Sequence, residues 1–294
     1  MKVGVIGAGT MGSGIAQAFA QSAEVETVYL CDIKQEFAEG GKARIAKGLN
    51  GRVAKGKMTQ EAADEIINKI QAGLNTQCVD ADLIVEAALE VMGVKQKTFK
   101  ELQEEIVKNP NCIYASNTSS LSITEISKPL NTPVIGMHFF NPAPVMKLVE
   151  VNAGYTTPQE DVAKVVEIAE KLGKTPVQVK EAPGFVVNRI LIPMINEGIF
   201  ILHEGTSSIE GIDTAMKLGA NHPMGPLELG DLVGLDICLY IMETLYDETD
   251  DSKYRPCPLL RKMVRANHLG RKTGIGFYRY NEDGTKTPVD ELGF

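Results

Sequence analysis

The sequence predicts an α/β protein in which a doubly wound, mostly parallel sheet is followed by an all-α domain. Through residue 182, short apolar runs alternate with helical periodicities, which is the pattern of parallel strands joined by crossover helices. Pro183 and Gly184 then punctuate the chain, and only helical patterns follow, over residues 185–204, 209–218, 227–245 and 259–267. We therefore expect two domains, residues 1–182 and 183–294.

Composition excludes several classes of protein. The net charge of −8 argues against a nucleic-acid binder, whose surface would be basic. The most apolar segment, residues 185–202, is interrupted by polar residues and by Pro193, so it predicts a buried helix and no membrane span. No signal-peptide pattern opens the chain, and the five scattered cysteines predict reduced thiols and no metal site. These features together predict a cytoplasmic location.

The first element is an apolar strand, residues 2–6, which leads directly into a glycine-rich turn and a helix. In the GxGxxG pattern, Gly7 permits a tight turn, Gly9 lets a pyrophosphate approach the backbone, and Gly12 lets helix and strand pack closely. A second strand, residues 27–31, ends at Asp32, whose carboxylate is placed to bind both ribose hydroxyls of NAD. This is a Rossmann-type signature, and only the nearby Lys34 leaves some tolerance for NADP open.

A basic segment, residues 34–57, comes next in this acidic protein. Helical spacing puts Ile45, Leu49 and Val53 on one face, and Arg44, Lys47 and Lys55 on another. Residues 59–70 predict a second helix with Thr59 as its N-cap, so a helical hairpin is inserted before the next strand. The basic face could receive a phosphorylated substrate, or it could be an ordinary solvated face.

Two further strands, residues 82–86 and 111–115, flank a helix over residues 94–108. The second runs into the polar cluster Ser116–Ser120, at the carboxyl end of a strand, where open α/β sheets bind ligands. The cluster could alternatively be only a cap for a helix over residues 121–127. Residues 133–137 form another apolar strand, which leads to His138.

The stretch from Gly136 to Val151 holds the main candidate for acid–base chemistry. Pro142 and Pro144 prevent any single helix or strand from continuing, which predicts strand, bend, strand, with His138 facing Glu150. A carboxylate bonded to one imidazole nitrogen fixes the tautomer and raises the basicity of the other nitrogen. A buried structural histidine beside an unrelated glutamate is the alternative interpretation.

The remaining elements of the sheet domain are a helix capped by Thr157 and Pro158, ending near residue 173, and a strand over residues 175–179. In the second domain, the helix from residue 185 is so apolar that we expect it to be buried on more than one side. It could pack against a second subunit, occupy the centre of its own domain, or do both.

Five motifs together resemble the L-3-hydroxyacyl-CoA dehydrogenase family, and within it the short bacterial 3-hydroxybutyryl-CoA dehydrogenases. They are VIGAGTMGSGIA near the start, ASNTSSLSIT at 115–124, GMHFFNPAPVMKLVEV at 136–151, PGFVVNRIL at 183–191 and GRKTGIGFYRY at 270–280. The resemblance covers essentially the whole chain, and the five motifs are more specific than the glycine pattern alone.

The resemblance implies roles for individual residues. The catalytic histidine falls on His138, its orienting carboxylate on Glu150, and the active-site serine and asparagine on Ser119 and Asn188. A CoA-binding lysine falls on Lys55, and Ser119 also contacts the substrate, whereas a serine contact of some members falls on Gly48 and is missing. The implied NAD contacts are Gly7, Gly9, Thr10, Met11, Gly12, Asp32, Glu90, Lys95, Ser119, Asn141 and Lys272.

The implied reaction is reversible oxidation of a (3S)-3-hydroxyacyl-CoA by NAD, with His138 taking the hydroxyl proton. Because Asn188 belongs to the helical domain, the site would lie in an interdomain cleft, and the same domain would form a homodimer. Two rivals stay open: a dehydrogenase of the same fold that acts on a free hydroxy acid, and a non-catalytic NAD-binding protein. A free carboxylate would favour an arginine clamp in the cleft, and the Lys55 face would then have no task.

Overall fold

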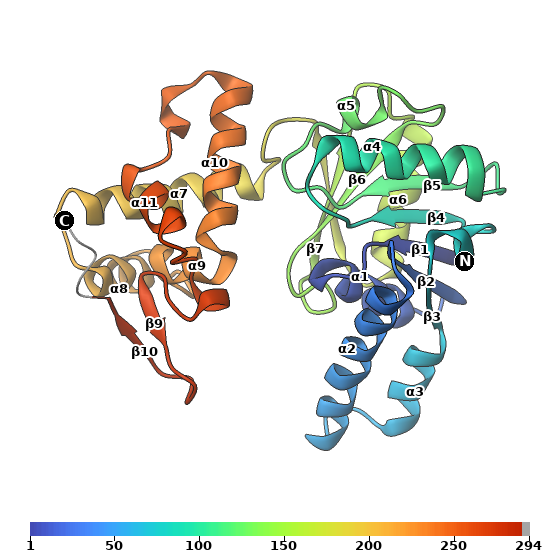
Figure 1. Ribbon diagram of the computed structural model, residues 1–294, viewed down its shortest axis with the longest axis horizontal. Helices are drawn as coiled ribbons and strands as arrows, with labels where there is room; N and C mark the ends of the chain where they lie inside the picture. The colour runs from blue at the N-terminus through green and yellow to red at the C-terminus, as the bar shows by residue number, and fades with distance from the viewer. Residues whose placement is uncertain (290–294) are drawn as a thin grey trace. The chain divides into compact units, whose positions relative to one another are not determined.

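A computed structural model describes residues 1–289 of the chain, which divides into two compact units, Met1–Phe185 and Val186–Phe294 (Figure 1). The first unit is built on an eight-stranded sheet in the order β3-β2-β1-β4-β5-β6-β7-β8. All neighbouring strands are parallel except β6 and β7, which run antiparallel. The strands are β1 (Lys2–Ile6), β2 (Thr27–Cys31), β3 (Ile70–Gly73), β4 (Leu83–Glu86), β5 (Ile113–Ser116), β6 (Val134–Phe139), β7 (Leu148–Ala153) and β8 (Thr175–Lys180).

Helices cover both faces of this sheet. The helical elements are α1 (Thr10–Ala20), α2 (Gln35–Ala54), α3 (Gln60–Asn68), the 3₁₀ turn η1 (Asn75–Cys78), α4 (Met92–Glu101), the π-helical turn η2 (Leu102–Ile106), α5 (Ile123–Ser127) and α6 (Gln159–Lys171). Strand residues alternate between two apolar clusters, because successive side chains point to opposite faces. Val28 and Leu30 pack with α1, α2, α3 and α6, whereas Tyr29 and Cys31 pack with α4, η2 and α5. The predicted doubly wound sheet is confirmed.

The inserted helical hairpin is also confirmed, with one correction. Helices α2 and α3 lie side by side (Figure 1), Ile45 and Leu49 are buried, and the Thr59 side chain caps α3 by accepting from the N–H of Ala62. The prediction of helix through Ile70 is wrong, because α3 ends at Asn68 and Ile70 begins the edge strand β3 beside β2.

The second unit is mainly helical. Its elements are α7 (Val187–His203), α8 (Ile209–Gly219), α9 (Pro226–Val233), α10 (Leu235–Thr249), η3 (Ser252–Tyr254), α11 (Pro258–Arg265), η4 (Arg271–Thr273), β9 (Tyr278–Tyr280) and β10 (Lys286–Pro288). The helical C-terminal domain is confirmed, and the β9–β10 hairpin is an addition to the all-α prediction. Within residues 1–289, no helix is both long and apolar enough to cross a membrane.

Two helix boundaries differ from the prediction in this unit. The single helix expected over residues 227–245 is two helices, because Gly234 adopts φ +103° between α9 and α10. The apolar helix α7 starts at Val187 and not at residue 185. Its inner face packs through Ile192, Ile195 and Ile199 into the unit's own core, so the predicted burial within its own domain is confirmed, and packing against a second subunit stays a prediction.

Candidate active site

The glycine turn between β1 and α1 leaves space where a phosphate group would approach. Gly7 has φ +98°, and a Cβ on Gly12 would lie 1.7 Å from the carbonyl oxygen of Gly7, so both positions require glycine. A Cβ on Gly9, by contrast, would meet nothing within 4 Å. Helix α1 then begins at Thr10 without a side-chain cap, so its first N–H groups and its dipole face the open space.

Asp32 closes the same turn from the end of β2. Its Oδ2 accepts from the backbone N–H of Ala8 at 2.7 Å, and its Oδ1 accepts from the N–H of Ile33 at 2.8 Å. An ionised carboxylate has about four acceptor positions, so it can bind a ribose diol in addition. Together with the open space over Gly9, this geometry fits NAD.

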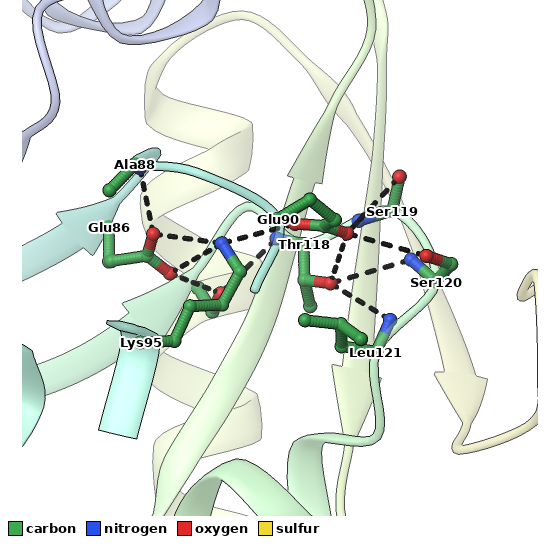
Figure 2. Close-up of polar contacts among 9 residues, drawn as sticks. Glu86, Ala88, Glu90, Lys95, Thr118, Ser119, Ser120 and Leu121 are labelled. Carbon is green, nitrogen blue, oxygen red and sulfur yellow. Dashed lines mark hydrogen bonds and ion pairs between the residues drawn. The ribbon is translucent and has the colours of Figure 1, made fainter. Parts of the chain in front are cut away.

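A buried ionic cluster lies beside the turn, at the carboxyl end of β4 (Figure 2). The Lys95 ammonium contacts both carboxylate oxygens of Glu86, at 2.8 and 3.0 Å, and Oε2 of Glu90 at 3.1 Å. Glu86 also accepts from the N–H of Ala88 and the hydroxyl of Ser116, both at 2.7 Å. Glu86 and Lys95 are fully buried, and Glu90 is partly accessible.

The charge state of this cluster follows from its contacts. Burial acts to raise the pKa of Glu90, but Lys95 and hydrogen bonds from Thr118 and Ser119 outweigh it, so the pKa lies below its usual range. Burial acts to lower the pKa of Lys95, but the two glutamates hold it above its usual range. Both groups are therefore ionised at neutral pH.

Glu90 organises the polar loop that follows β5 (Figure 2). Its Oε1 accepts from the hydroxyl of Thr118 at 2.6 Å and from the N–H of Ser119 at 2.8 Å. Helix α5 is capped by Ser122, which accepts from the N–H of Glu125. The interpretation of Ser116–Ser120 as a helix cap is therefore wrong, and the loop lies between the carboxyl end of β5 and the cap of α5.

His138 and Glu150 form a buried pair, as the strand–bend–strand pattern predicts. They face each other across the antiparallel β6–β7 ladder, and Nδ1 of His138 lies 2.8 Å from Oε2 of Glu150. The side chains are 7% and 1% exposed. Because an ionised carboxylate only accepts, the bond to Glu150 needs the proton on Nδ1, and a neutral ring in this tautomer has its lone pair on Nε2, the form a general base requires.

Aromatic rings flank His138. The ring of Phe140 lies 4.5 Å away and that of Phe185 lies 5.6 Å away, between centroids. Phe185 has φ +53°, an uncommon conformation for a residue with a side chain, and its ring is buried. The Pro183–Gly184 turn therefore places an apolar ring beside the imidazole, which limits access of water to it.

Lys174 stabilises the bend between β6 and β7 by hydrogen bonds to its backbone. Its ammonium donates to the carbonyl oxygens of Ala143 and Met146, at 2.6 and 2.8 Å. Burial, with a smaller contribution from Lys147, lowers the pKa of Lys174. Asn141, an expected NAD contact, is exposed at the start of this bend.

The basic hairpin face divides into a structural and an exposed part. The Arg44 guanidinium donates to the carbonyl oxygen of Ala8 and the hydroxyl of Ser13, which braces the glycine turn. A cavity of about 300 Å³ lies between α1, α2 and the β6–β7 bend, and Arg44, Gly48 and Arg52 line it. Lys55 is exposed directly after the end of α2.

Two of the expected site residues belong to the second unit. Asn188 lies in the first turn of α7 and is partly exposed. Lys272 is exposed in η4, and its ammonium contacts Oδ2 of Asp236 at 2.6 Å. The other expected residues are carried by the first unit.

Glu86, Thr118, Phe185 and Lys174 were not assigned roles from the sequence. A signal existed for Glu86, because an acidic residue that closes an apolar strand needs a buried partner. Thr118 lies in the polar cluster Ser116–Ser120, which marked the loop but not this residue, and no local pattern separates Lys174 from surface lysines. Their roles depend on which backbone groups the fold brings near them.

A dinucleotide-binding sheet with a histidine–carboxylate pair at its carboxyl edge defines a nicotinamide-dependent dehydrogenase. Comparison with known proteins identifies the family. Residues 2–182 match the NAD-binding domain of 3-hydroxyacyl-CoA dehydrogenase, and residues 184–280 match the C-terminal domain of the same enzyme. The chain belongs to the 3-hydroxyacyl-CoA dehydrogenase family.

Named relatives extend over nearly the whole chain. The 3-hydroxybutyryl-CoA dehydrogenase of Clostridioides difficile is 53% identical over 285 residues, which cover 96% of this chain and 100% of the relative. That of Bradyrhizobium diazoefficiens is 48% identical and covers 95% of each chain. The crystal structure of (S)-3-hydroxybutyryl-CoA dehydrogenase from Ralstonia eutropha is 46% identical, has a TM-score of 0.89, and covers 96% of this chain and 99% of that chain.

Proposed function

We propose that this protein catalyses the reversible oxidation of (3S)-3-hydroxybutyryl-CoA to acetoacetyl-CoA, with NAD as the hydride acceptor. The observation that carries the proposal is the buried His138–Glu150 pair at the sheet edge, in a chain of this family. Relatives that bear the name of this activity are about half identical to the chain over nearly all of its length.

In this mechanism, bound NAD supplies the hydride acceptor, and the chain supplies proton transfer and orientation. Nε2 of His138 takes the C3 hydroxyl proton during oxidation and returns it during reduction, a step typically worth about 10² to 10⁴ in rate. Glu150 holds the ring through Nδ1 and stabilises the imidazolium. Ser119 and Asn188 hold the reacting oxygen atoms by hydrogen bonds.

Residues 1–182 bind the cofactor in this proposal, through the glycine turn, Asp32 and the Glu90 loop, with Asn141 and Lys272 as further contacts. Lys55 and the arginine-lined cavity beside Gly48 receive the phosphates of CoA, because guanidinium and ammonium groups are the usual partners of phosphate. Residues 183–294 contribute Asn188 and the contact of a homodimer, and the protein works in the cytoplasm. Light scattering coupled to size exclusion tests the dimer.

The activity is tested by following NADH absorbance with acetoacetyl-CoA, and with free acetoacetate or NADPH as controls. Rapid oxidation with the CoA ester alone is the expected result. Equal rates with free acetoacetate would instead support a dehydrogenase that acts on a free hydroxy acid. Intact NADH binding without turnover of any of these substrates would support a non-catalytic NAD-binding protein.

A further inference from the structure

The buried cluster of Glu86, Lys95 and Glu90, which lies beside the predicted cofactor site, has a net negative charge. Two carboxylates, Glu86 and Glu90, share the single ammonium of Lys95 (Figure 2). The exposed fractions of the three side chains are 0% for Glu86, 1% for Lys95 and 28% for Glu90. One negative charge is therefore left over, and the accessible member of the cluster is Glu90.

The contacts divide the cluster into a closed pair and an open carboxylate. Both oxygens of Glu86 accept from Lys95, and each accepts one more hydrogen bond, from Ala88 or Ser116. Glu90 meets Lys95 through Oε2 only and turns Oε1 towards the loop that carries Ser119. Glu86 thus neutralises Lys95 locally, and the unbalanced charge faces the loop.

This charge has a consequence for the redox state of the cofactor. The nicotinamide ring is positively charged in NAD⁺ and uncharged in NADH, so a nearby negative charge stabilises the oxidised form alone. A site with little water screens such an interaction less than bulk solvent does. The carboxyl ends of β4 and β5, which carry Glu90 and Ser119, form the edge where ligands bind in such sheets.

We propose that Glu86 is a positioning residue that offsets the charge of Lys95, so that the cluster keeps a net charge of −1 and strengthens NAD⁺ binding relative to NADH binding. The proposal rests on the proposed function, in which the Glu90 loop binds the cofactor and Ser119 holds the reacting oxygen, so that the nicotinamide ring would lie near both. A purely structural Glu86 would contribute to folding and would leave the preference between the two cofactor forms unchanged.

The test is the ratio of the dissociation constants of NADH and NAD⁺ in the wild type and in Glu86→Gln. The substitution keeps the size and hydrogen-bonding capacity of the side chain and brings the cluster to a net charge of zero. For a separation of roughly 8–10 Å between the cluster and the ring, one unit charge in a partly solvated site predicts a ratio that falls by about 3- to 30-fold. NADH fluorescence gives one constant without tryptophan background, since the chain has no Trp, and calorimetry gives the other.

Two variants separate charge from shape. Glu86→Gln combined with Lys95→Gln removes the neutral pair and restores a net charge of −1, so the ratio should return to the wild-type value. Asp82→Asn is the matched control, because this carboxylate also accepts from a backbone N–H and a side-chain donor, of Lys2 and Asn109, but lies at the opposite end of β4 from Glu86. Its ratio should equal that of the wild type.

An unchanged ratio in folded Glu86→Gln overturns the proposal, and so does a double variant that stays shifted. If Glu86→Gln does not fold, the double variant is compared with the same variant carrying Glu90→Gln, which again removes one charge. Equal ratios in those two proteins overturn the proposal. The failure of the proposed function would look different, since the wild type would then not oxidise NADH with acetoacetyl-CoA, whatever the binding ratio.

Discussion

Replacing Glu150 by glutamine tests the role of the buried pair most directly. Glu150 is 1% exposed and lies 2.8 Å from Nδ1 of His138, so its carboxylate acts on the imidazole from inside the protein. Glutamine has nearly the same shape and retains an acceptor oxygen for the Nδ1 proton. The substitution therefore removes the negative charge and preserves the orientation of the ring.

The magnitude follows from the positive charge on His138, which in the assayed direction must be protonated before it can donate its proton to acetoacetyl-CoA. An adjoining opposite charge stabilises an ionised group by an amount equal to about 1–3 pKa units, which corresponds to about 1.4–4 kcal/mol. We expect kcat of Glu150→Gln to fall by about 10- to 10³-fold. The KM for acetoacetyl-CoA should change little, because the buried Glu150 contacts His138 and not the substrate in the proposed site.

The assay is steady-state NADH oxidation with acetoacetyl-CoA, with thermal unfolding measured in parallel as a control for folding. Combining Glu150→Gln with His138→Ala should cost no more than His138→Ala alone, since Glu150 acts through that ring. A folded Glu150→Gln enzyme with wild-type kcat would refute the reasoning. Additive losses in the double variant would refute the route through His138.

Two further predictions concern the turn and the helical unit. Gly9→Ala should fold normally yet weaken NADH binding by about tenfold or more, because the added Cβ meets no protein atom but stands where the pyrophosphate approaches. Gly12→Ala should instead disrupt the turn, because its Cβ would collide with the carbonyl oxygen of Gly7. A fluorescence titration of Gly9→Ala that matches the wild type would contradict this. Burial raises the pKa of Asp231 to about 6, although hydrogen bonds from Tyr278, Phe277 and Tyr280 act to lower it. Between its ordinary pKa and about pH 6 the folded protein therefore keeps a proton on Asp231 that the unfolded chain releases. The stabilisation that this proton gives the fold is lost as pH rises through about 6. The unfolding free energy should gain about 1 kcal/mol from this group between pH 7 and pH 5, and urea denaturation should show that gain missing in Asp231→Asn.

Local sequence patterns predicted the structure correctly where the residues that decide the conformation lie in one short segment. The glycine spacing after an apolar strand predicts the turn because glycine is needed at Gly7 and Gly12 for steric reasons that any such turn shares. The two prolines between His138 and Glu150 predict the bend for a similar reason, since proline removes backbone donors and fixes φ. The strand pairing across that bend then brings the two side chains together, and the structure confirms it.

Patterns failed where a distant segment decided the outcome. Ile70 fits the apolar periodicity of α3 equally well, and only the free edge of β2 makes it a strand residue. Gly234 is a different case, because it adopts a positive φ and divides the helix predicted over residues 227–245. A glycine disfavours a helix interior, so a local signal was present there, and the apolar periodicity on both sides outweighed it in the prediction. At Ile70, by contrast, tertiary contacts selected the conformation.

The sequence by itself determined the doubly wound sheet, the helical second domain and the identity of the histidine–carboxylate pair, because these follow from periodicity, turn chemistry and short-range spacing. Only the tertiary structure decided which charges share a partner. The Glu86, Lys95 and Glu90 side chains could each have been solvated, and the fold instead buries two of them and directs the third to the Ser119 loop. Electrostatic interactions act through space and depend on burial, so no pattern along the chain shows how a net charge is distributed within a site.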